Sequence, residues 1–249
     1  MIPAAKSDLF GRFFSFHAER RLRAAFSSVG VRGLERLAAA TGAGPVLVVS
    51  NHTAWWDPLV AIALSYRVLH VDAYALMDAK NLRRFPFFAK VGAFGVDLDD
   101  PADGARALRY AKKLLDHNQR QGQRLLWIFP QGAERPVTER PLGFKAGSAH
   151  IARASRAVTV IPVGLRYEMR SAPLPELFVS VGEPVAIKTL AAQEEAVTQA
   201  LDAIERSLLA GTTEADFAPL FAGSRRRPRV DVAARILSWL TRPRRLGER

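Results

Sequence analysis

Short apolar runs alternate along the chain with longer segments in which apolar and polar residues are mixed. Two of these runs, at residues 46–50 and 125–129, contain almost only aliphatic and aromatic residues, which is typical of strands buried on both faces of a parallel sheet. Weaker apolar runs predict further strands at residues 69–74, 93–97, 158–163, 165–167 and 178–181.

The segments between these runs predict helices. The first covers residues 7–40, with Ser7 or Asp8 as a possible N-cap and with Gly30 and Gly33 as breaks. Pro58 begins a second helix that runs to about residue 66, because proline is favoured in the first turn. Further helices are predicted at residues 100–120, 146–156 and 191–209.

Strands that alternate with helices predict an α/β fold with a mostly parallel central sheet flanked by helices. A chain of 249 residues can form this fold as a single domain. We expect an N-terminal helical segment over residues 1–40, the central domain over residues 41–217 and a basic amphipathic tail over residues 218–249, so that both ends are helical extensions.

The net charge of +12 is concentrated at the two ends of the chain. Residues 1–40 carry 7 basic and 3 acidic side chains, residues 41–223 carry 20 and 19, and residues 224–249 carry 9 and 2. The nearly neutral middle argues against a basic groove for nucleic acid, and no nucleic-acid motif accompanies the charge. The basic ends favour contact with an anionic surface such as a membrane.

The chain contains no cysteine, which excludes disulfides, thiolate metal sites and a cysteine nucleophile and fits a cytosolic compartment. No run of about 20 predominantly apolar residues predicts a transmembrane helix. The N-terminal phenylalanines are too interrupted by charge to form a signal peptide. We therefore expect a cytoplasmic protein, peripheral on the inner face of the membrane.

A polar loop at residues 51–57 directly follows the apolar run at 46–50, and ligands of α/β proteins bind at such strand ends. It contains His52 and Asp57, which are close enough along the chain for the carboxylate to hold one imidazole nitrogen. The other nitrogen could then act as a general base on a substrate hydroxyl. A solvated loop with no catalytic role would have the same local sequence.

Four sequence blocks, in this order, resemble the glycerolipid acyltransferase family typified by 1-acylglycerol-3-phosphate acyltransferases. The resemblance covers roughly residues 40–185. The blocks are the His-x4-Asp loop with His52 and Asp57, the block that ends at Asp97, the Phe129-Pro130-x-Gly132 block with its downstream Phe144-Lys145-x-Gly147, and the Val160-Ile-Pro-Val163 block.

This resemblance implies an O-acyltransferase that moves a fatty acyl group from an acyl thioester to a lipid hydroxyl. The thioester would be acyl-CoA or acyl-carrier protein, and neither a metal nor another cofactor is implied. His52 would be the general base and Asp57 would orient it. Backbone N–H groups around Gly132 would stabilise the tetrahedral oxyanion. The alternative is a lipid-binding or acyl-thioester-binding module that has the same fold but does not turn over.

The resemblance also implies substrate-binding residues, among which Arg135 and Lys145 would hold a phosphate of the donor or of the acceptor. The complete substrate-binding set that we expect is Asn51, Pro130, Gln131, Gly132, Arg135 and Lys145.

Several positions depart from the family pattern near the acceptor site. Acidic residues follow Val96 where the family usually has arginine, and Glu134 stands where another arginine is usual. Carboxylates repel a phosphate dianion. The acceptor could therefore be lysophosphatidate, with Arg106, Arg109 or Arg135 compensating, or a neutral or zwitterionic lipid such as a glycolipid, an amino-acid lipid or a carotenoid glycoside.

The C-terminal segment forms an amphipathic pattern when it is placed on a helix, with Trp239 and aliphatic residues opposite arginines. Such a helix suits the surface of an anionic membrane, although docking on the domain is the alternative. The phenylalanine-rich N-terminal segment is a second candidate for insertion into that surface. Trp55 and Trp56 could line a substrate entrance or belong to the core.

Overall fold

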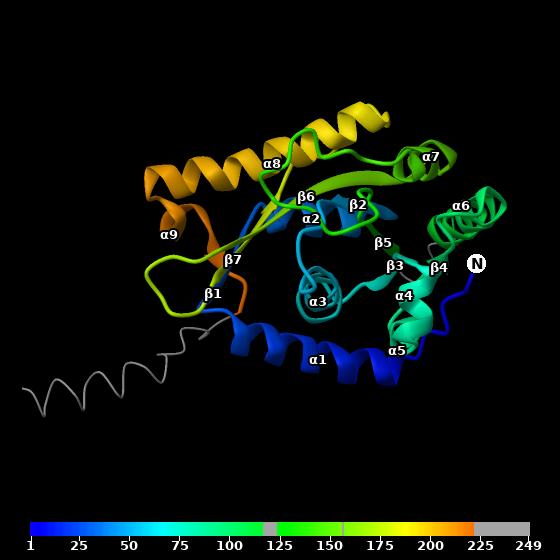
Figure 1. Cartoon of the computed structure of the whole chain (residues 1–249), viewed down its shortest axis with the longest axis horizontal. Helices are drawn as coiled ribbons and strands as arrows, with labels where there is room; N and C mark the ends of the chain where they lie inside the picture. The colour runs from blue at the N-terminus through cyan, green and yellow to red at the C-terminus, as the bar shows by residue number, and fades with distance from the viewer. Residues whose placement is uncertain (117–123, 156, 222–249) are drawn as a thin grey trace, which may run out of the picture.

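In the computed structural model, residues 1–116, 124–155 and 157–221 are described, and they form an α/β domain around a sheet of eight strands (Figure 1). The strand order across the sheet is β4-β3-β5-β2-β6-β7-β1-β8. Their bounds are β1 (Ser28–Arg32), β2 (Val46–Ser50), β3 (Asp72–Asp78), β4 (Ala93–Val96), β5 (Arg124–Ile128), β6 (Thr159–Glu168), β7 (Glu176–Val181) and β8 (Ala218–Pro219).

The first five strands in this order, from β4 to β6, pair in parallel, and so do β7 and β1. The β6–β7 and β1–β8 pairs are antiparallel. The prediction of a mostly parallel sheet is therefore confirmed. The two densest apolar runs of the sequence are the central neighbours β2 and β5, where both faces are buried.

Helices cover both faces of the sheet. In Figure 1, α1 runs along the lower side and α8 along the upper side, with the strands between them. The helices are α1 (Asp8–Ala25), α2 (Leu34–Ala43), α3 (Asp57–Ala63) continued by the π-helical turn η1 (Leu64–Val68), α4 (Ala79–Arg84), α5 (Phe87–Lys90), α6 (Pro101–Leu115), α7 (Gly147–Ala154), α8 (Leu190–Ala210) and α9 (Thr213–Asp216).

Two apolar cores follow from this layering, one on each face of the sheet. Residues of α1, α2 and α3 pack on one face, with Leu22, Leu37 and Val60 fully buried. Residues of α6, α7 and α8 pack on the other face, with Ile151 and Val197 deeply buried. Burial of this many aliphatic side chains is the main stabilising contribution to such a domain.

The predicted helix over residues 7–40 is wrong in its middle. Helix α1 starts at the predicted N-cap, since the Ser7 hydroxyl accepts a hydrogen bond from the Phe10 N–H, but it ends at Ala25. Residues 28–32 form strand β1, which pairs in parallel with β7. The run Ser-Val-Gly-Val-Arg is short and weakly apolar, and only its partner strand far along the chain makes it a strand.

Three smaller differences concern strand bounds. The run at residues 69–74 begins in the loop that follows η1, so that β3 starts only at Asp72 and continues to Asp78. The runs at 158–163 and 165–167 are one long strand, β6. The predicted C-terminal tail, residues 218–249, begins with β8, which pairs with β1, and with the buried Phe221, so these first residues pack on the domain.

Other predicted elements lie partly or wholly outside the described residues. The amphipathic C-terminal helix lies in residues 222–249, and the last part of the helix predicted at 100–120 is also outside. Within residues 1–116, 124–155 and 157–221, we find no helix that combines the length and the hydrophobicity required to cross a bilayer.

Candidate active site

The candidate site lies at the carboxyl ends of β2 and β5. These strands are parallel neighbours, with Val49 paired to Ile128, so the loops that follow them leave the sheet at the same edge. One is the His52 loop, residues 51–57, and the other is the loop over residues 129–146, which leads to α7. Strand ends of this kind are the usual ligand-binding edge of an open α/β sheet.

His52 and Asp57 form the hydrogen-bonded pair that the sequence predicts. The Nδ1 atom of His52 lies 2.7 Å from Oδ2 of Asp57. The Asp57 side chain is completely buried, whereas the His52 side chain retains 20% exposure. With a proton on Nδ1 donated to the carboxylate, Nε2 is left as an acceptor for a substrate proton.

Asp57 is held by more than the imidazole. Its Oδ2 atom also accepts hydrogen bonds from the N–H groups of Thr53 (2.7 Å) and Ala54 (3.0 Å). Its Oδ1 atom accepts from the hydroxyl of Tyr167, at the end of β6. Because both oxygens are engaged in a buried site, the carboxylate has one orientation, and this orientation fixes the imidazole ring.

Tyr167 contacts the candidate site, and the sequence did not reveal it. It is 110 residues away from Asp57, and nothing in its local sequence distinguishes it from an ordinary strand residue. Burial, together with the charge and the hydrogen bond of Asp57, raises the pKa of Tyr167 well above its usual value. The phenol therefore stays protonated and keeps donating to Asp57.

The buried side chains of Asn51 and Gln131 connect the loop at residues 51–57 to β6 and to the loop after β5. The buried amide of Asn51 donates to the Leu165 carbonyl (2.9 Å) and accepts from the Leu165 N–H (2.8 Å). The buried amide of Gln131 accepts from the His52 N–H (2.6 Å) and donates to the Leu142 carbonyl (3.1 Å). Each amide thus has protein partners for both its N–H and its oxygen, and the predicted contact of these two residues with substrate stays a prediction.

The backbone at Pro130 and Gly132 shapes the second loop. The Pro130 carbonyl accepts from the Lys145 N–H at 2.9 Å, and the Gly132 N–H donates to the Phe129 carbonyl at 3.1 Å. Gly132 has a φ of 73°, and the position of its missing Cβ would lie 2.9 Å from the Lys145 ammonium nitrogen. A side chain there would be strained by the positive φ, and the flexible end of Lys145 would have to move, so the position favours glycine.

Arg135 and Lys145 come to the same loop but differ in their surroundings. The Arg135 N–H donates to the His52 carbonyl (2.9 Å), while its guanidinium forms a 2.6 Å ion pair with Glu139. The exposed Lys145 lies beside Gly132. The structure thus brings both predicted residues to the site, with the guanidinium of Arg135 already paired.

The alternative cations are placed on α6. Arg106 pairs with Asp100 and Asp103, and Arg109 is exposed. Asp100 caps α6 by accepting from the Ala102 N–H at 2.9 Å, which is the capping role expected of the acidic run.

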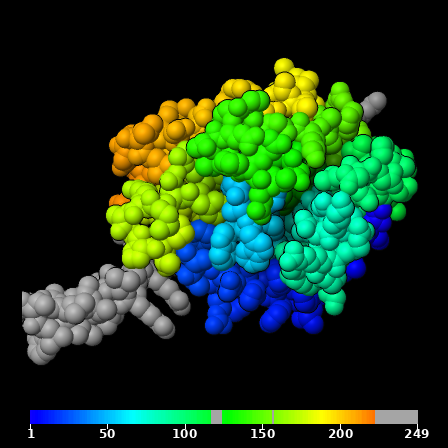
Figure 2. All heavy atoms as spheres, viewed as in Figure 1, coloured from blue at the N-terminus to red at the C-terminus, as the bar shows by residue number. Residues whose placement is uncertain are grey.

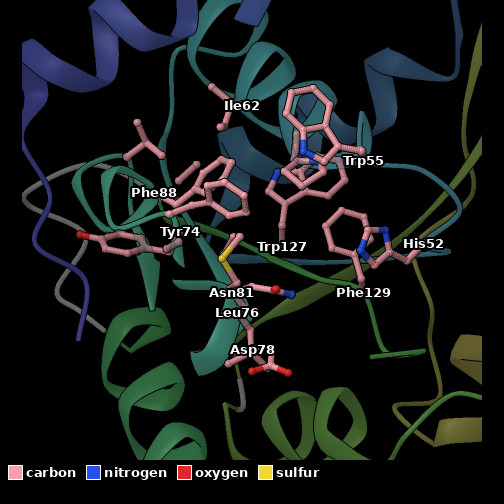
Figure 3. A pocket seen from close by; sticks show the side chains of 18 of the residues that line it. His52, Trp55, Ile62, Tyr74, Leu76, Asp78, Asn81, Phe88, Trp127 and Phe129 are labelled. Carbon is pink, nitrogen blue, oxygen red and sulfur yellow. The ribbon is translucent and has the colours of Figure 1, made fainter. Parts of the chain in front are cut away.

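A mostly apolar cavity of about 410 Å³ extends from His52 between α3 and β3 (Figure 3). Its wall includes the aromatic rings of Trp127, Phe129 and Phe88, and the Phe129 ring lies 4.9 Å from the His52 ring. Ala61, Ala73 and Ala75 also line it, which leaves room between the helix and the strand. A space of this shape and composition suits an extended hydrocarbon chain whose reactive end lies at His52.

The two adjacent tryptophans have different surroundings. Trp55 is 56% exposed and lines the cavity, whereas Trp56 packs against Phe26 of the core. Figure 3 shows Trp55 close to His52, with Asn81 and Asp78 on the other side of the opening. We call the residues Trp55, Asp78, Asn81, Arg84 and Glu134, all of which line this cavity, the entrance residues.

The segments that carry the site lie on one face of the molecule. Figure 2 shows them as the cyan segment after β2, the green loop after β5 and the teal segment around α4. Residues from all three line the cavity, so its wall is assembled from parts of the chain that are distant in sequence.

A family model described as acyltransferase matches residues 28–166 of the chain, which include both loops of the site. Among solved structures, the crystal structure of the 1-acyl-sn-glycerophosphate (LPA) acyltransferase PlsC from Thermotoga maritima is similar, with a TM-score of 0.55 and 20% sequence identity over 80% of each chain. At this identity the likeness concerns the fold. Among curated proteins, no significant relative is found.

Proposed function

The chain belongs to the acyltransferase family, and we propose that it is an O-acyltransferase in which His52 activates the hydroxyl of a lipid acceptor. The observation that carries this proposal is the hydrogen-bonded His52–Asp57 pair at the mouth of an apolar cavity. The donor would be an acyl thioester, on coenzyme A or on acyl-carrier protein, and its acyl chain would occupy the cavity.

The proposed reaction begins when Nε2 of His52 takes the proton of the acceptor hydroxyl. The hydroxyl oxygen attacks the thioester carbon and forms the new C–O bond, and the C–S bond then breaks. The proton passes from the imidazolium to the departing thiolate, so that His52 returns to its neutral form. Asp57 stabilises the imidazolium in between, and its own position is supported by Tyr167, Thr53 and Ala54.

The oxyanion of the tetrahedral intermediate requires hydrogen-bond donors. Because the Gly132 N–H donates to the Phe129 carbonyl, the donors would come from the N–H groups that follow Gly132 in the loop. The close approach that glycine permits at this position supports the assignment.

Two classes of acceptor are compatible with the family and the site. One is a phosphorylated lipid of the lysophosphatidate type, which Arg135 and Lys145 would bind, and the other is a non-phosphate lipid or glycolipid. PlsC, which has a similar fold, is an acyltransferase for 1-acyl-sn-glycerophosphate. The charged side chains that line the cavity would affect a phosphorylated acceptor more strongly than an uncharged one.

We further propose that the protein works on the inner face of an anionic membrane as a peripheral protein of the cytoplasm. Three large apolar side chains of α1, Leu9, Phe13 and Phe16, are exposed to solvent, with Arg12 and Arg20 on the same helix. Aromatic and aliphatic residues next to arginines suit the headgroup region of such a membrane.

A non-catalytic module that binds lipid or acyl thioester is the second candidate. The altered residues at the entrance motivate it, because a changed entrance could accompany the loss of turnover.

The two candidates are separated by an acyl-transfer assay on the purified protein. Wild-type protein is mixed with acyl-CoA or acyl-carrier protein and a panel of lipid hydroxyls, and released thiol and acylated lipid are measured together. We expect stoichiometric thiol and product with at least one acceptor, and we expect both to be lost in His52→Ala. Tight thioester binding with no product across the panel would favour the binding module.

A further inference from the structure

The charges of the entrance residues are poorly suited to a phosphate. Among the described residues that line the cavity, Asp78 and Glu134 are acidic and Arg84 is basic. The Arg84 guanidinium lies against the ring of Phe85, 5.1 Å from its centroid. A phosphate dianion at this opening would therefore face two carboxylates for one guanidinium, which is an unfavourable electrostatic balance.

Two cations of this part of the molecule, Arg135 and Lys80, are already paired with acidic neighbours. Arg135 pairs with Glu139 at 2.6 Å, and Lys80 pairs with Asp99 at 2.8 Å. The ion pair with Lys80 lowers the pKa of Asp99, and the charge of Lys145 contributes to this shift. A phosphate would have to compete with carboxylates that these cations already contact.

Glu134 brings a negative charge close to the reacting groups. Its charge contributes, after burial and Asp57, to raising the pKa of Tyr167, the phenol that donates to Asp57. Glu134 also lines the cavity together with His52. A phosphorylated acceptor whose hydroxyl reached His52 would carry its phosphate near this carboxylate.

The two remaining entrance residues that carry no charge, Trp55 and Asn81, can contact an acceptor by ring packing and by hydrogen bonds. The exposed indole of Trp55 and the Asn81 amide line the same cavity as His52, and Figure 3 shows Trp55 above His52 and Asn81 below it. Carboxylates accept hydrogen bonds from hydroxyl groups, and an amide both donates and accepts. An aromatic face next to such groups fits a sugar ring, whose C–H face packs on the indole while its hydroxyls meet the polar side chains.

We infer that the acceptor is a lipid with an uncharged, hydroxyl-rich headgroup, a glycosyl lipid, and that a sugar hydroxyl receives the acyl group. This inference rests on the proposed acyltransferase function. The reaction balances as above: the sugar oxygen gains the acyl carbon, the C–S bond breaks, and the hydroxyl proton ends on the thiol. Asp78, Asn81 and Glu134 hold the sugar hydroxyls, and Trp55 supports the ring.

The first test compares two acceptors that share one lipid tail, a monoglucosyl lipid and lysophosphatidate, with one acyl-CoA as donor. We expect kcat/KM to be at least about tenfold higher for the glucosyl lipid. Equal use of both lipids, or a preference for lysophosphatidate, would overturn the inference while supporting the acyltransferase function. The absence of product with either lipid and with the wider acceptor panel would refute both.

The second test reverses the charge of one entrance residue. We expect Glu134→Arg to raise kcat/KM for lysophosphatidate about tenfold, because it replaces a repulsive charge by an attractive one. Glu195→Arg is the matched control, since Glu195 is an exposed residue of α8 whose carboxylate contacts Gln199 and does not line the cavity. Equal responses of the two variants would contradict a local role for Glu134.

The third test separates ring stacking from charge. We expect Trp55→Ala to raise the KM for the glucosyl lipid about three- to tenfold with kcat nearly unchanged, and Trp55→Phe to retain most of the affinity. The KM for lysophosphatidate should change less. A parallel loss for both lipids, or no change for either, would exclude Trp55 as the support for the sugar ring.

Discussion

The His52 loop and the entrance residues differ in the burial of their polar groups. The carboxylate of the loop is buried and hydrogen-bonded within the protein, whereas the polar groups of the entrance are accessible. In the loop, Asp57 is fully buried and its two oxygens accept hydrogen bonds from Tyr167, Thr53, Ala54 and His52. At the entrance, Trp55 and Glu134 are exposed and face the cavity. The protein thus holds its base in one geometry and leaves the groups that would meet the acceptor accessible.

This contrast indicates that chemistry and acceptor choice are set by different parts of the molecule. In the proposed mechanism, the preorganised His52–Asp57 pair performs the same proton transfer with every acceptor hydroxyl. Exposed charges at the opening can change with the acceptor without disturbing that pair. Substitutions in the loop should therefore affect kcat with every acceptor, and substitutions at the entrance should affect the ratio between acceptors.

The largest effect should come from the base itself. We expect His52→Ala to lower kcat about 10³–10⁴-fold with all acceptors, because the substitution removes the imidazole that takes the hydroxyl proton in the proposed mechanism. Thermal unfolding should change little, since the side chain is partly exposed. His150→Ala, at an exposed histidine, is the control and should retain activity. Full activity of His52→Ala would refute the mechanism.

The next effect tests the orientation of the imidazole. Asp57→Asn should lower kcat about 10²–10³-fold, because an amide no longer favours the tautomer with the proton on Nδ1 and no longer stabilises the imidazolium. Asp100→Asn, at the N-cap of α6, is the matched control and should be nearly silent, since asparagine also caps helices. A comparable loss in both variants would mean that the Asp57 effect is not specific to the pair.

A moderate loss of stability and of kcat is expected on substitution of Gln131, which connects the two loops. Gln131→Leu removes the buried bonds to the His52 N–H and the Leu142 carbonyl, and it should lower the free energy of unfolding by about 1–3 kcal/mol. We also expect kcat to fall about tenfold with every acceptor, because the backbone of the base is less well held. Chemical denaturation and steady-state kinetics measure the two changes. If Gln131→Leu changed the ratio of kcat/KM between two acceptors and left kcat unchanged, the loop would also influence the choice of acceptor, contrary to our expectation.

A smaller effect is expected at Tyr167. Because the pKa of Tyr167 is raised above its usual value, the phenol keeps its proton up to and beyond pH 10. Its hydrogen bond to Asp57 is therefore present below pH 10 and is lost only at higher pH. Tyr167→Phe should therefore lower kcat about three- to tenfold evenly between pH 6 and 9. A pH–rate profile of both proteins tests this, and a change in its shape over that range would show that Tyr167 titrates there.

The smallest effect concerns the far wall of the cavity. Tyr66 lines this cavity and also a second, more polar one of about 1330 Å³, and its hydroxyl donates to the Val91 carbonyl at 3.1 Å. Tyr66→Ala should join the two spaces and favour longer acyl chains, by about fourfold for each methylene that becomes buried. Tyr66→Phe keeps the ring and should leave the chain-length profile unchanged. An unchanged profile in both variants would place the acyl chain elsewhere.

The sequence by itself predicted which strands form the centre of the sheet and that His52 and Asp57 form a hydrogen-bonded pair. The runs that form β2 and β5 are too apolar for any position other than the middle of a parallel sheet, so their carboxyl ends predicted where the site lies. His52 and Asp57 are five residues apart, so a tight loop can bring the carboxylate to the imidazole.

Only the tertiary structure decided how this pair is supported and what surrounds it. Tyr167 reaches Asp57 from 110 residues away, and Ser28–Arg32 becomes a strand because β7 lies beside it. The inward direction of Asn51 and Gln131 likewise depends on β6 and on the loop after β5. These features arise from contacts between segments that are distant in sequence. The local pattern of apolar and polar residues in one segment does not indicate which distant segment will pack against it.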